Sequence, residues 1–364
     1  MFKVEVKKYK SGDIICQQSD KTDKLFVLKS GKIKVIVNHE KKITPELVKS
    51  TGHQINEIST PNQTIGEIGL LLNRDRTASL VADNSVELEV ISFEGDIVLS
   101  DVIKHNKQIG LNIVHTVVNR INHTAEQIYD AKKNVDKLIG IINEFTPPLA
   151  EAKLEGQANM GHYQAYKQLL KSKFDMISDY IKAVNREYSG FEMFETRENN
   201  VLKKGQLFFL KNSDEECFFL MIKGKVNVLC NKLPVITCEK DNTIFANYSV
   251  LFNNEDELKN FFEFVAADDN VKIKKIEKEQ FFGLLDKEPA LYGYLSKILC
   301  TLLVNTDKVL LEIKKRNETL ISVLSGDPNN LKTLYEKILE LKIEGGDIQA
   351  RAVEFFEKLK ELEN

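Results

Sequence analysis

The chain has 364 residues, with 51 Lys and Arg against 54 Asp and Glu and a formal net charge of −3 at pH 7. That length accommodates two or three domains of ordinary size. The near balance of charge excludes the global positive field of proteins that grip nucleic-acid phosphates, so a nucleic-acid partner is not expected. No stretch approaches the roughly 18 apolar residues of a membrane span, and the amino terminus lacks an apolar signal core. We therefore expect a cytoplasmic protein without a membrane partner.

Residues 1 to about 92 are predicted to form short strands. The runs "IKVIV" after Gly31, "QINEI" around Ile55 and "VELEVIS" from Val86 are separated by turn residues. Strands at this spacing are typical of a small barrel or sandwich.

The sequence period changes between residues 96 and 145. Ile109, Ile113, Val117 and Ile121 recur every four residues, which predicts one or two long amphipathic helices. The run Thr146-Pro147-Pro148 is expected to end them, because proline cannot continue a helix that has begun. Helix packing is the preferred interpretation of such stripes.

Residues 191 to about 277 return to strand-like runs, and the remainder is predicted to be helical. The order β, α, β, α suggests an internal duplication. The stretch "LFVLKSGKIKV" at 25–35 aligns without a gap on "FFLMIKGKVNV" at 218–228. Gly12 precedes Gly31 by the same 19 positions that separate Gly205 from Gly224. We interpret the chain as two copies of one β fold.

The stretch "GEIGLLLNRDRTASL" at 66–80 has the composition of an anion site. A glycine followed by apolar residues can begin a short helix with free N–H groups, and Arg76 supplies a permanently charged fork for phosphate oxygens. Glu67 would repel a phosphate, so it is expected to accept a hydrogen bond from a sugar hydroxyl. Together these residues predict a binding site for a sugar phosphate. The alternative is that Glu67 and Arg76 pair with each other on a surface loop.

This stretch resembles the phosphate-binding cassette of the cyclic-nucleotide-binding domain family, which includes the catabolite activator protein and the regulatory subunits of cyclic-AMP-dependent protein kinase. The resemblance extends over about residues 8 to 125 and includes the hairpin-like stretch at 12–35. It implies that the Gly66 backbone and the Glu67 side chain hold the ribose 2′-hydroxyl. Arg76 would neutralise the cyclic phosphate, and the Thr77 main chain and hydroxyl would add bonds to it. The predicted ligand-binding residues are Gly66, Glu67, Ile68, Gly69, Leu70, Arg76, Thr77, Ala78 and Thr124.

Three residues depart from the family pattern. Ser19 and Thr22 stand where the family usually has glycines, which affects the conformation of that loop. Asp75 replaces the frequent proline before the arginine and is expected to pair with Arg76 and compete with the ligand. Binding weaker than the family norm would follow.

The base is expected to meet the helix that follows the first β segment, where Thr124 is the candidate. A polar residue on a solvated helix face is the alternative interpretation of Thr124. Cyclic AMP is favoured over cyclic GMP on bacterial precedent within the family. A threonine after the arginine, as at Thr77, is found in several members selective for cyclic GMP, whereas a serine there serves cyclic AMP in others.

The second copy has lost the site. Ala246 stands for Gly66, Asn247 for Glu67 and Asp256 for Arg76, and a carboxylate at the last position would repel a phosphate. We interpret this copy as a structural or partner-binding module, with an uncharged ligand as the alternative.

No catalytic motif, metal-ligand spacing or cofactor motif is present in the sequence, so an enzyme is not expected. The five cysteines form no CxxC pair and are interpreted as packing residues. The carboxyl-terminal stretch is predicted to form two amphipathic helices around Gly345-Gly346. Their mixed charge is unlike a DNA-reading helix.

The sequence therefore predicts an α+β chain with two jelly-roll-like β-barrel cyclic-nucleotide-binding domains, joined and followed by amphipathic helices. The expected segments are an intact domain at 1–125, a helical linker at 126–190, a degenerate domain at 191–300 and carboxyl-terminal helices at 301–364. The predicted function is a cytoplasmic cyclic-nucleotide receptor that relays occupancy through helices to a protein partner, with a homodimer through the long helix left open. The alternatives are a ligand-independent scaffold and a transcription regulator with an unrecognised DNA-binding surface.

Overall fold

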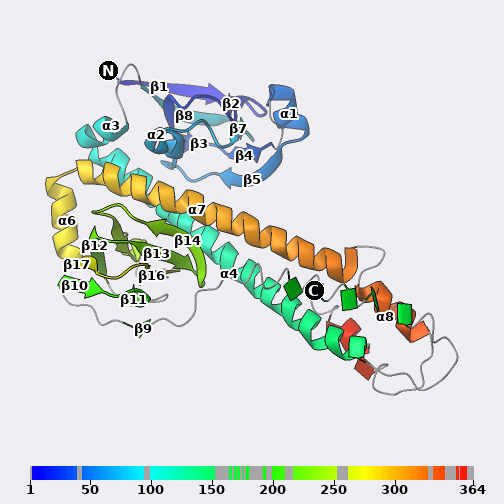
Figure 1. Ribbon diagram of the computed structural model, residues 1–364. Coiled ribbons are helices and arrows are strands. Elements are labelled where there is room, and N and C mark those ends of the chain that lie inside the picture. Colours follow the sequence, from blue (N-terminus) through cyan, green and yellow to red (C-terminus); the bar gives the residue numbers. More distant parts are fainter. Residues whose placement is uncertain are drawn as a thin grey trace. The chain divides into compact units, whose positions relative to one another are not determined.

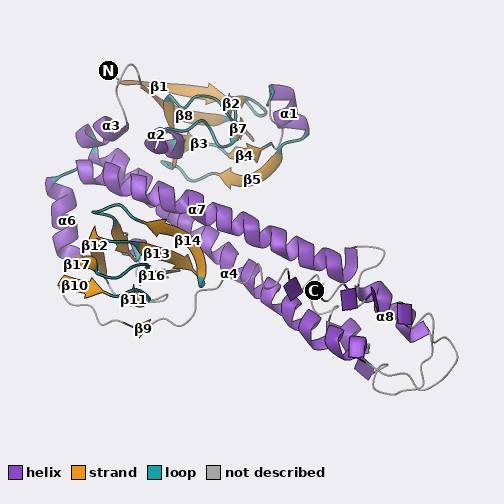
Figure 2. Cartoon of the chain, viewed as in Figure 1, coloured by secondary structure: helices purple, strands orange, loops and turns teal. Residues whose placement is uncertain are grey.

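The computed structural model describes residues 2–38, 43–93, 99–151, 164–165, 168–169, 171–172, 175, 178–179, 192–193, 199–209, 216–251, 261–326, 331–340, 350–351 and 353–358. The chain divides into two compact units. The first contains Met1–Thr124, Gly190–Leu229 and Val235–Thr306, and the second contains Ala125–Ser189, Cys230–Pro234 and Asp307–Asn364. The first unit includes two groups of strands, drawn in orange in Figure 2. We call residues 2–93 the first β module and residues 192–277 the second β module.

The first β module consists of two four-stranded antiparallel sheets, with strand orders β1-β8-β3-β6 and β2-β7-β4-β5 (Figure 1). Its elements are β1 (Phe2–Tyr9), β2 (Ile14–Cys16), β3 (Lys24–Ser30), β4 (Ile33–Val37), α1 (Pro45–Ser50), β5 (His53–Ile58), β6 (Thr64–Ile65), α2 (Glu67–Leu72), β7 (Ser79–Ala82) and β8 (Val86–Phe93). In β8, Val86, Leu88 and Val90 are buried and the intervening residues are half-buried, because alternate side chains of a strand point to opposite faces.

The second β module repeats this topology, with strand orders β10-β17-β12-β15 and β14-β13-β16-β11-β9. Among the described strand pairings, the pairing of the short β9 with β11 is the only parallel one. Its elements are β9 (Glu192–Met193), β10 (Asn199–Leu202), β11 (Gln206–Phe209), β12 (Cys217–Lys223), β13 (Val226–Cys230), β14 (Leu233–Cys238), β15 (Ile244–Ala246), the 3-10 helix η1 (Tyr248–Leu251), β16 (Phe262–Ala266) and β17 (Val271–Glu277).

Equivalent turns in the two β modules have the same backbone geometry. Gly12 and Gly205 have φ of 84° and 85°, and their N–H groups donate to the carbonyls of Ala82 and Ala266 at 2.8 and 2.9 Å. A second pair of turns agrees as closely. Asn62 and Asn242 both have φ of 65°, and their N–H groups donate at 2.7 Å to the carbonyls of Leu28 in β3 and Met221 in β12. The duplication read from the sequence is therefore confirmed in the backbone.

The predicted barrels are confirmed only as pairs of sheets. Among the described residues, no strand pairing joins the two sheets of either module, so a closed barrel is not seen. The predicted division into four consecutive segments stays a prediction. The two compact units are each built from several discontinuous segments and do not test it.

Long helices follow each β module. After the first come α3 (Leu99–His105) and α4 (Lys107–Glu151), and after the second come α6 (Lys278–Lys287), α7 (Ala290–Ile321), the π-helical turn η3 (Ser322–Gly326) and α8 (Leu331–Glu340). At Gly110 of α4, an added Cβ would lie 2.7 Å from the Cβ of Tyr292, so α4 and α7 approach closely there. None of the described helices is long and apolar enough to cross a membrane. The predicted turn at Gly345-Gly346 lies outside the described residues.

The prediction that Pro147 and Pro148 end the helix was wrong, because α4 continues to Glu151. Proline removes one N–H and crowds the preceding turn, but its fixed φ is itself helical. The buried stripe before the prolines, which includes Leu138 and Ile142, favours continuation. Most of the residues predicted as the rest of the linker, 152–190, lie outside the described part of the chain.

Ser19 adopts the left-handed conformation, with φ of 70°, at a position where the resemblance expects glycine. Because that conformation costs a non-glycine residue about 1–2 kcal/mol, and glycine adds unfolded-state entropy, Ser19→Gly is expected to raise the free energy of unfolding by about 0.5–1 kcal/mol. Denaturant unfolding measures the change. Lys21→Gly, in the same loop at an ordinary φ, is the control and should lower stability. A loss of stability in Ser19→Gly would contradict the strained loop.

Candidate functional site

The candidate site follows β6, where the chain turns at Gly66 into α2. Gly66 has φ of 93° and precedes the helix as its N-cap. A Cβ at Gly66 would collide with the guanidinium of Arg76. Glycine is therefore required here both by the backbone conformation and by the close approach of the arginine.

Arg76 is a buried cation whose side chain, among the described residues, bonds only to neutral groups. Its side chain is 8% exposed, donates to the Lys24 carbonyl at 2.6 Å and to the Gly66 carbonyl at 3.4 Å, and lies 5.2 Å from the centroid of the Phe26 ring. No carboxylate within the described residues pairs with it. The expected competition from Asp75 is therefore wrong in this structure, because Asp75 is exposed and forms no ion pair with its neighbour.

The loop that contains Ser19 and Asp20 is hydrogen-bonded to the backbone of the same arginine. The Ser19 N–H donates to the Arg76 carbonyl at 2.8 Å, and the Arg76 N–H donates to the Asp20 carbonyl at 2.9 Å. The Thr22 hydroxyl donates to the Arg74 carbonyl at 2.8 Å. Ser19 and Thr22, two of the residues that depart from the family pattern, thus bond to the backbone of the cassette.

Glu67 is fully buried, and one of its two carboxylate oxygens forms an ion pair. Its Oε1 accepts a bond from Nη1 of Arg120 on α4 at 3.0 Å. Its Oε2 has no hydrogen-bond partner in the described part of the chain. The alternative in which Glu67 pairs with Arg76 is wrong. A buried carboxylate oxygen without a donor is costly, so this atom is matched to a ligand that brings one.

The two thiols nearest these charges supply no negative charge. Burial raises the pKa of Cys16 to about 11, even though the Arg76 charge beside it favours the thiolate. Burial also raises the pKa of Cys300 well above its usual range, and the Glu67 carboxylate raises it further. Both stay protonated at neutral pH, so the Arg76 charge is left for an external anion.

The other predicted residues lie around this core with different exposure. Ile68 and Gly69 are buried, Leu70 and Ala78 are half-buried, and Thr77 is exposed. Thr124 is 8% exposed, so its interpretation as a residue on a solvated helix face is wrong. It follows Arg120 by four residues, which places both on one face of α4.

Arg120 is the site residue that the sequence reasoning missed. It lies 53 positions from Glu67, and one arginine in an amphipathic helix resembles any surface charge. The signal that points to it is its position one turn before Thr124, on the helix that the resemblance already placed near the base.

The equivalent position in the second β module lacks these charges. Ala246, the last residue of β15, and Asn247, which follows it, are buried and stand at the positions equivalent to Gly66 and Glu67. Asp256 lies outside the described residues.

Comparison with known proteins gives one family match. The profile described as "Cyclic nucleotide-binding domain" matches residues 6–95. A search of curated proteins found no match.

The chain is also similar to several solved structures. They include the cAMP-bound PfPKA-R (141–441), at 15% identity over 85% of this chain and 81% of that chain, with a TM-score of 0.28. The regulatory domain of Toxoplasma gondii PKA with cAMP has 12% identity over 79% of this chain and 83% of that chain, with a TM-score of 0.23. A mutant regulatory subunit of a cAMP-independent protein kinase A from Trypanosoma brucei has 16% identity over 79% of this chain and 78% of that chain, with a TM-score of 0.24.

The family profile covers β2 to β8, which include Gly66, Glu67 and Arg76. Residues 6–95 of this chain therefore match the cyclic nucleotide-binding domain family.

Proposed function

We propose that this chain is a cyclic-nucleotide receptor whose first β module binds one nucleotide, with cyclic AMP preferred, and relays its occupancy through α4 to a protein partner. The observation that carries the proposal is the buried Arg76, which has no acidic partner in the described structure, beside Glu67 with its unpartnered Oε2. A cyclic phosphate brings the missing anion, and a ribose brings the missing hydroxyl donor.

Arg76 would bind the phosphate by exchanging weak bonds for strong ones. Its present bonds are to carbonyls of Lys24 and Gly66, and the bond to Gly66 is long at 3.4 Å. Charge-assisted, bidentate bonds to phosphate are roughly twice as strong as neutral bonds. The gain is larger because the guanidinium is already desolvated by its surroundings. Thr77, exposed next to it, would add a hydroxyl and an N–H.

Glu67 would hold the ribose with Oε2 while Oε1 keeps Arg120. One carboxylate then contacts both the ligand and α4. A ligand changes distant structure only if it binds two arrangements with different affinity. The Glu67–Arg120 ion pair is a physical route for that difference, because a shift of the carboxylate toward the ribose alters its bond to the helix.

Thr124 is proposed as the base contact. It is buried one turn beyond Arg120, so a nucleotide whose ribose meets Glu67 would place its base near this part of α4. A second copy bound through α4 remains one form of the proposed partner.

Titration calorimetry of the chain with cyclic AMP and cyclic GMP tests the proposal. Because Ala246 and Asn247 replace the glycine and the carboxylate in the second β module, we expect about one cyclic AMP per chain. Binding of cyclic GMP is expected to be weaker. A ratio near two would show a second nucleotide site. No saturable heat with either nucleotide would leave a ligand-independent scaffold as the function.

A further inference from the structure

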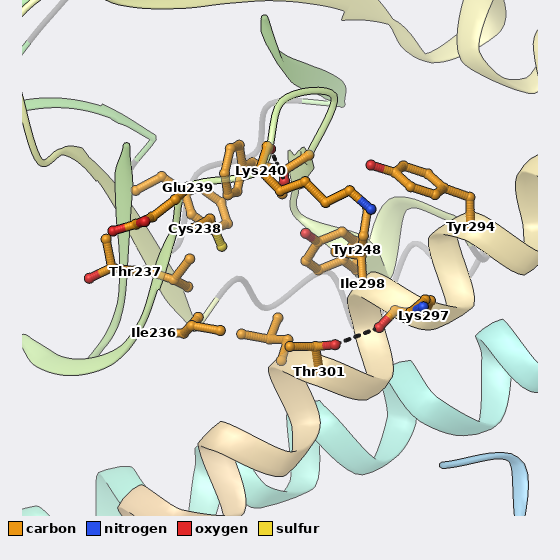
Figure 3. A pocket seen from close by; sticks show the side chains of 15 residues that line it. Ile236, Thr237, Cys238, Glu239, Lys240, Tyr248, Tyr294, Lys297, Ile298 and Thr301 are labelled. Atoms are coloured by element: carbon orange, nitrogen blue, oxygen red, sulfur yellow. Dashed lines mark hydrogen bonds between the residues drawn. The ribbon is translucent and has the colours of Figure 1, made fainter. Parts of the chain in front are cut away.

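The second β module contains a pocket of about 260 Å³ between its sheets and α7. Figure 3 shows the end of β14 and the turn after it on one side and the side chains of α7 on the other. The volume is slightly below the range of about 300–1,000 Å³ for ordinary small-molecule sites, so a single short chain or ring fits it.

Most of the wall is apolar, and the hydroxyl groups that line it already donate to the protein. The Tyr248 hydroxyl donates to the Ile244 carbonyl at 2.7 Å, and the Tyr294 hydroxyl donates to the Asn242 carbonyl at 3.1 Å. The three lining threonines also donate, to Lys240, Asn227 and Lys297 at 2.6, 2.7 and 2.8 Å. The wall therefore suits an apolar body rather than a ring of polar groups such as a sugar.

Two lysines that line the pocket have no acidic partner among the described residues. Lys240 reaches across the pocket toward α7, where its ammonium lies 5.6 Å from the centroid of the Tyr294 ring (Figure 3). Lys297 of α7 is exposed at the same pocket, and no carboxylate within the described residues pairs with either lysine. The one lining carboxylate, Glu239, is already bound by Lys225 at 2.8 Å.

The remaining titratable lining groups add no negative charge. Burial raises the pKa of the Cys238 thiol to about 11 and the pKa of the Tyr248 phenol above its usual range. At neutral pH the pocket is thus an apolar cavity with two uncompensated ammonium groups at its mouth.

We propose that this pocket binds a small amphipathic organic anion, with its apolar body between β14 and α7 and its carboxylate between Lys240 and Lys297. A neutral ligand would leave both ammonium groups unpaired, and a cationic ligand would be repelled by them. The site uses different residues from the Gly66–Arg76 cassette and does not depend on nucleotide binding there.

Calorimetry with decanoate, decanol and decyltrimethylammonium, each below its self-association concentration, tests the proposal. The three probes share a ten-carbon chain and differ in the charge of the head. We expect saturable decanoate binding at one site per chain and decanol binding at least about fivefold weaker, with no binding of the cation. Equal binding of decanoate and decanol, or no saturable decanoate binding, would overturn the proposal.

Variants locate the site. Lys240→Gln and Lys297→Gln are each expected to weaken decanoate binding about fivefold while decanol binding is unchanged. Lys308→Gln, an exposed position on α7 outside the pocket, is the matched control and should bind decanoate normally. Arg76→Ala should also bind decanoate normally, which separates this site from the cassette. Unchanged decanoate binding in the double variant Lys240→Gln/Lys297→Gln would place the anion elsewhere and refute the assignment.

Discussion

Arg76→Ala is expected to weaken cyclic AMP binding by more than about a hundredfold, which corresponds to about 3 kcal/mol or more. The guanidinium is buried and lies beside Gly66 without an acidic partner in the described structure. In the variant, a bound phosphate would lose its only buried counter-charge in the cassette. Calorimetry or competition with a fluorescent nucleotide measures the loss.

The matched control is Arg74→Ala. Arg74 lies two positions away and is exposed, and the structure uses only its backbone, which accepts a bond from Thr22. It has the same formal charge, so its removal tests a general electrostatic effect. We expect a change of less than about threefold. Equal losses of affinity in both variants would exclude the cassette as the site. So would unchanged affinity in Arg76→Ala, provided that this variant shows the same unfolding transition as the unmodified chain.

Saturating cyclic AMP is expected to slow amide hydrogen exchange in 107–124 of α4 as well as in 66–80. A coupling of about 1–3 kcal/mol corresponds to about 5- to 150-fold slower exchange. The physical reason is that Glu67 contacts the ligand and Arg120 at once, so binding favours one arrangement of the helix. Hydrogen exchange followed by mass spectrometry measures both regions in one experiment.

Arg120→Met separates binding from relay. Methionine keeps most of the side-chain length but removes the bond to Glu67, so we expect protection of 66–80 to persist while the effect on α4 becomes smaller. Lys133→Met, at an exposed position further along α4, is the control and should relay normally. Protection confined to the cassette in the unmodified chain would mean that the protein holds nucleotide without relaying it.

The sequence was sufficient for the parts of the fold that depend on local patterns. The alternation in 86–92 predicted β8, and the four-residue period from Ile109 predicted α4. The glycine spacing predicted the duplication, because Gly12 and Gly205 are needed for the same left-handed turn. The end of α4 was misplaced because the proline rule is local, whereas packing of the stripe that includes Ile142 is not.

The site was predictable where its residues are contiguous and not where they are distant. Gly66 and Arg76 lie ten positions apart and form a recognisable motif, but Arg120 joins them only through folding. The pocket of the second β module could not be predicted from the sequence, because Lys240 and Lys297 are far apart in the chain and line one pocket only after folding. Neither lysine belongs to a motif.

The central claim is that Glu67 and its neighbours bind a cyclic nucleotide, and the decisive measurement is the affinity of unmodified and Glu67→Ala chains for cyclic AMP and its 2′-deoxy analogue. Because Oε2 of Glu67 is buried without a donor, removing the 2′-hydroxyl should weaken binding to the unmodified chain by about 10- to 100-fold. Glu67→Ala should bind cyclic AMP more weakly and no longer distinguish the two ligands. Equal affinities of the unmodified chain for both ligands, or discrimination that persists in Glu67→Ala, would contradict the account.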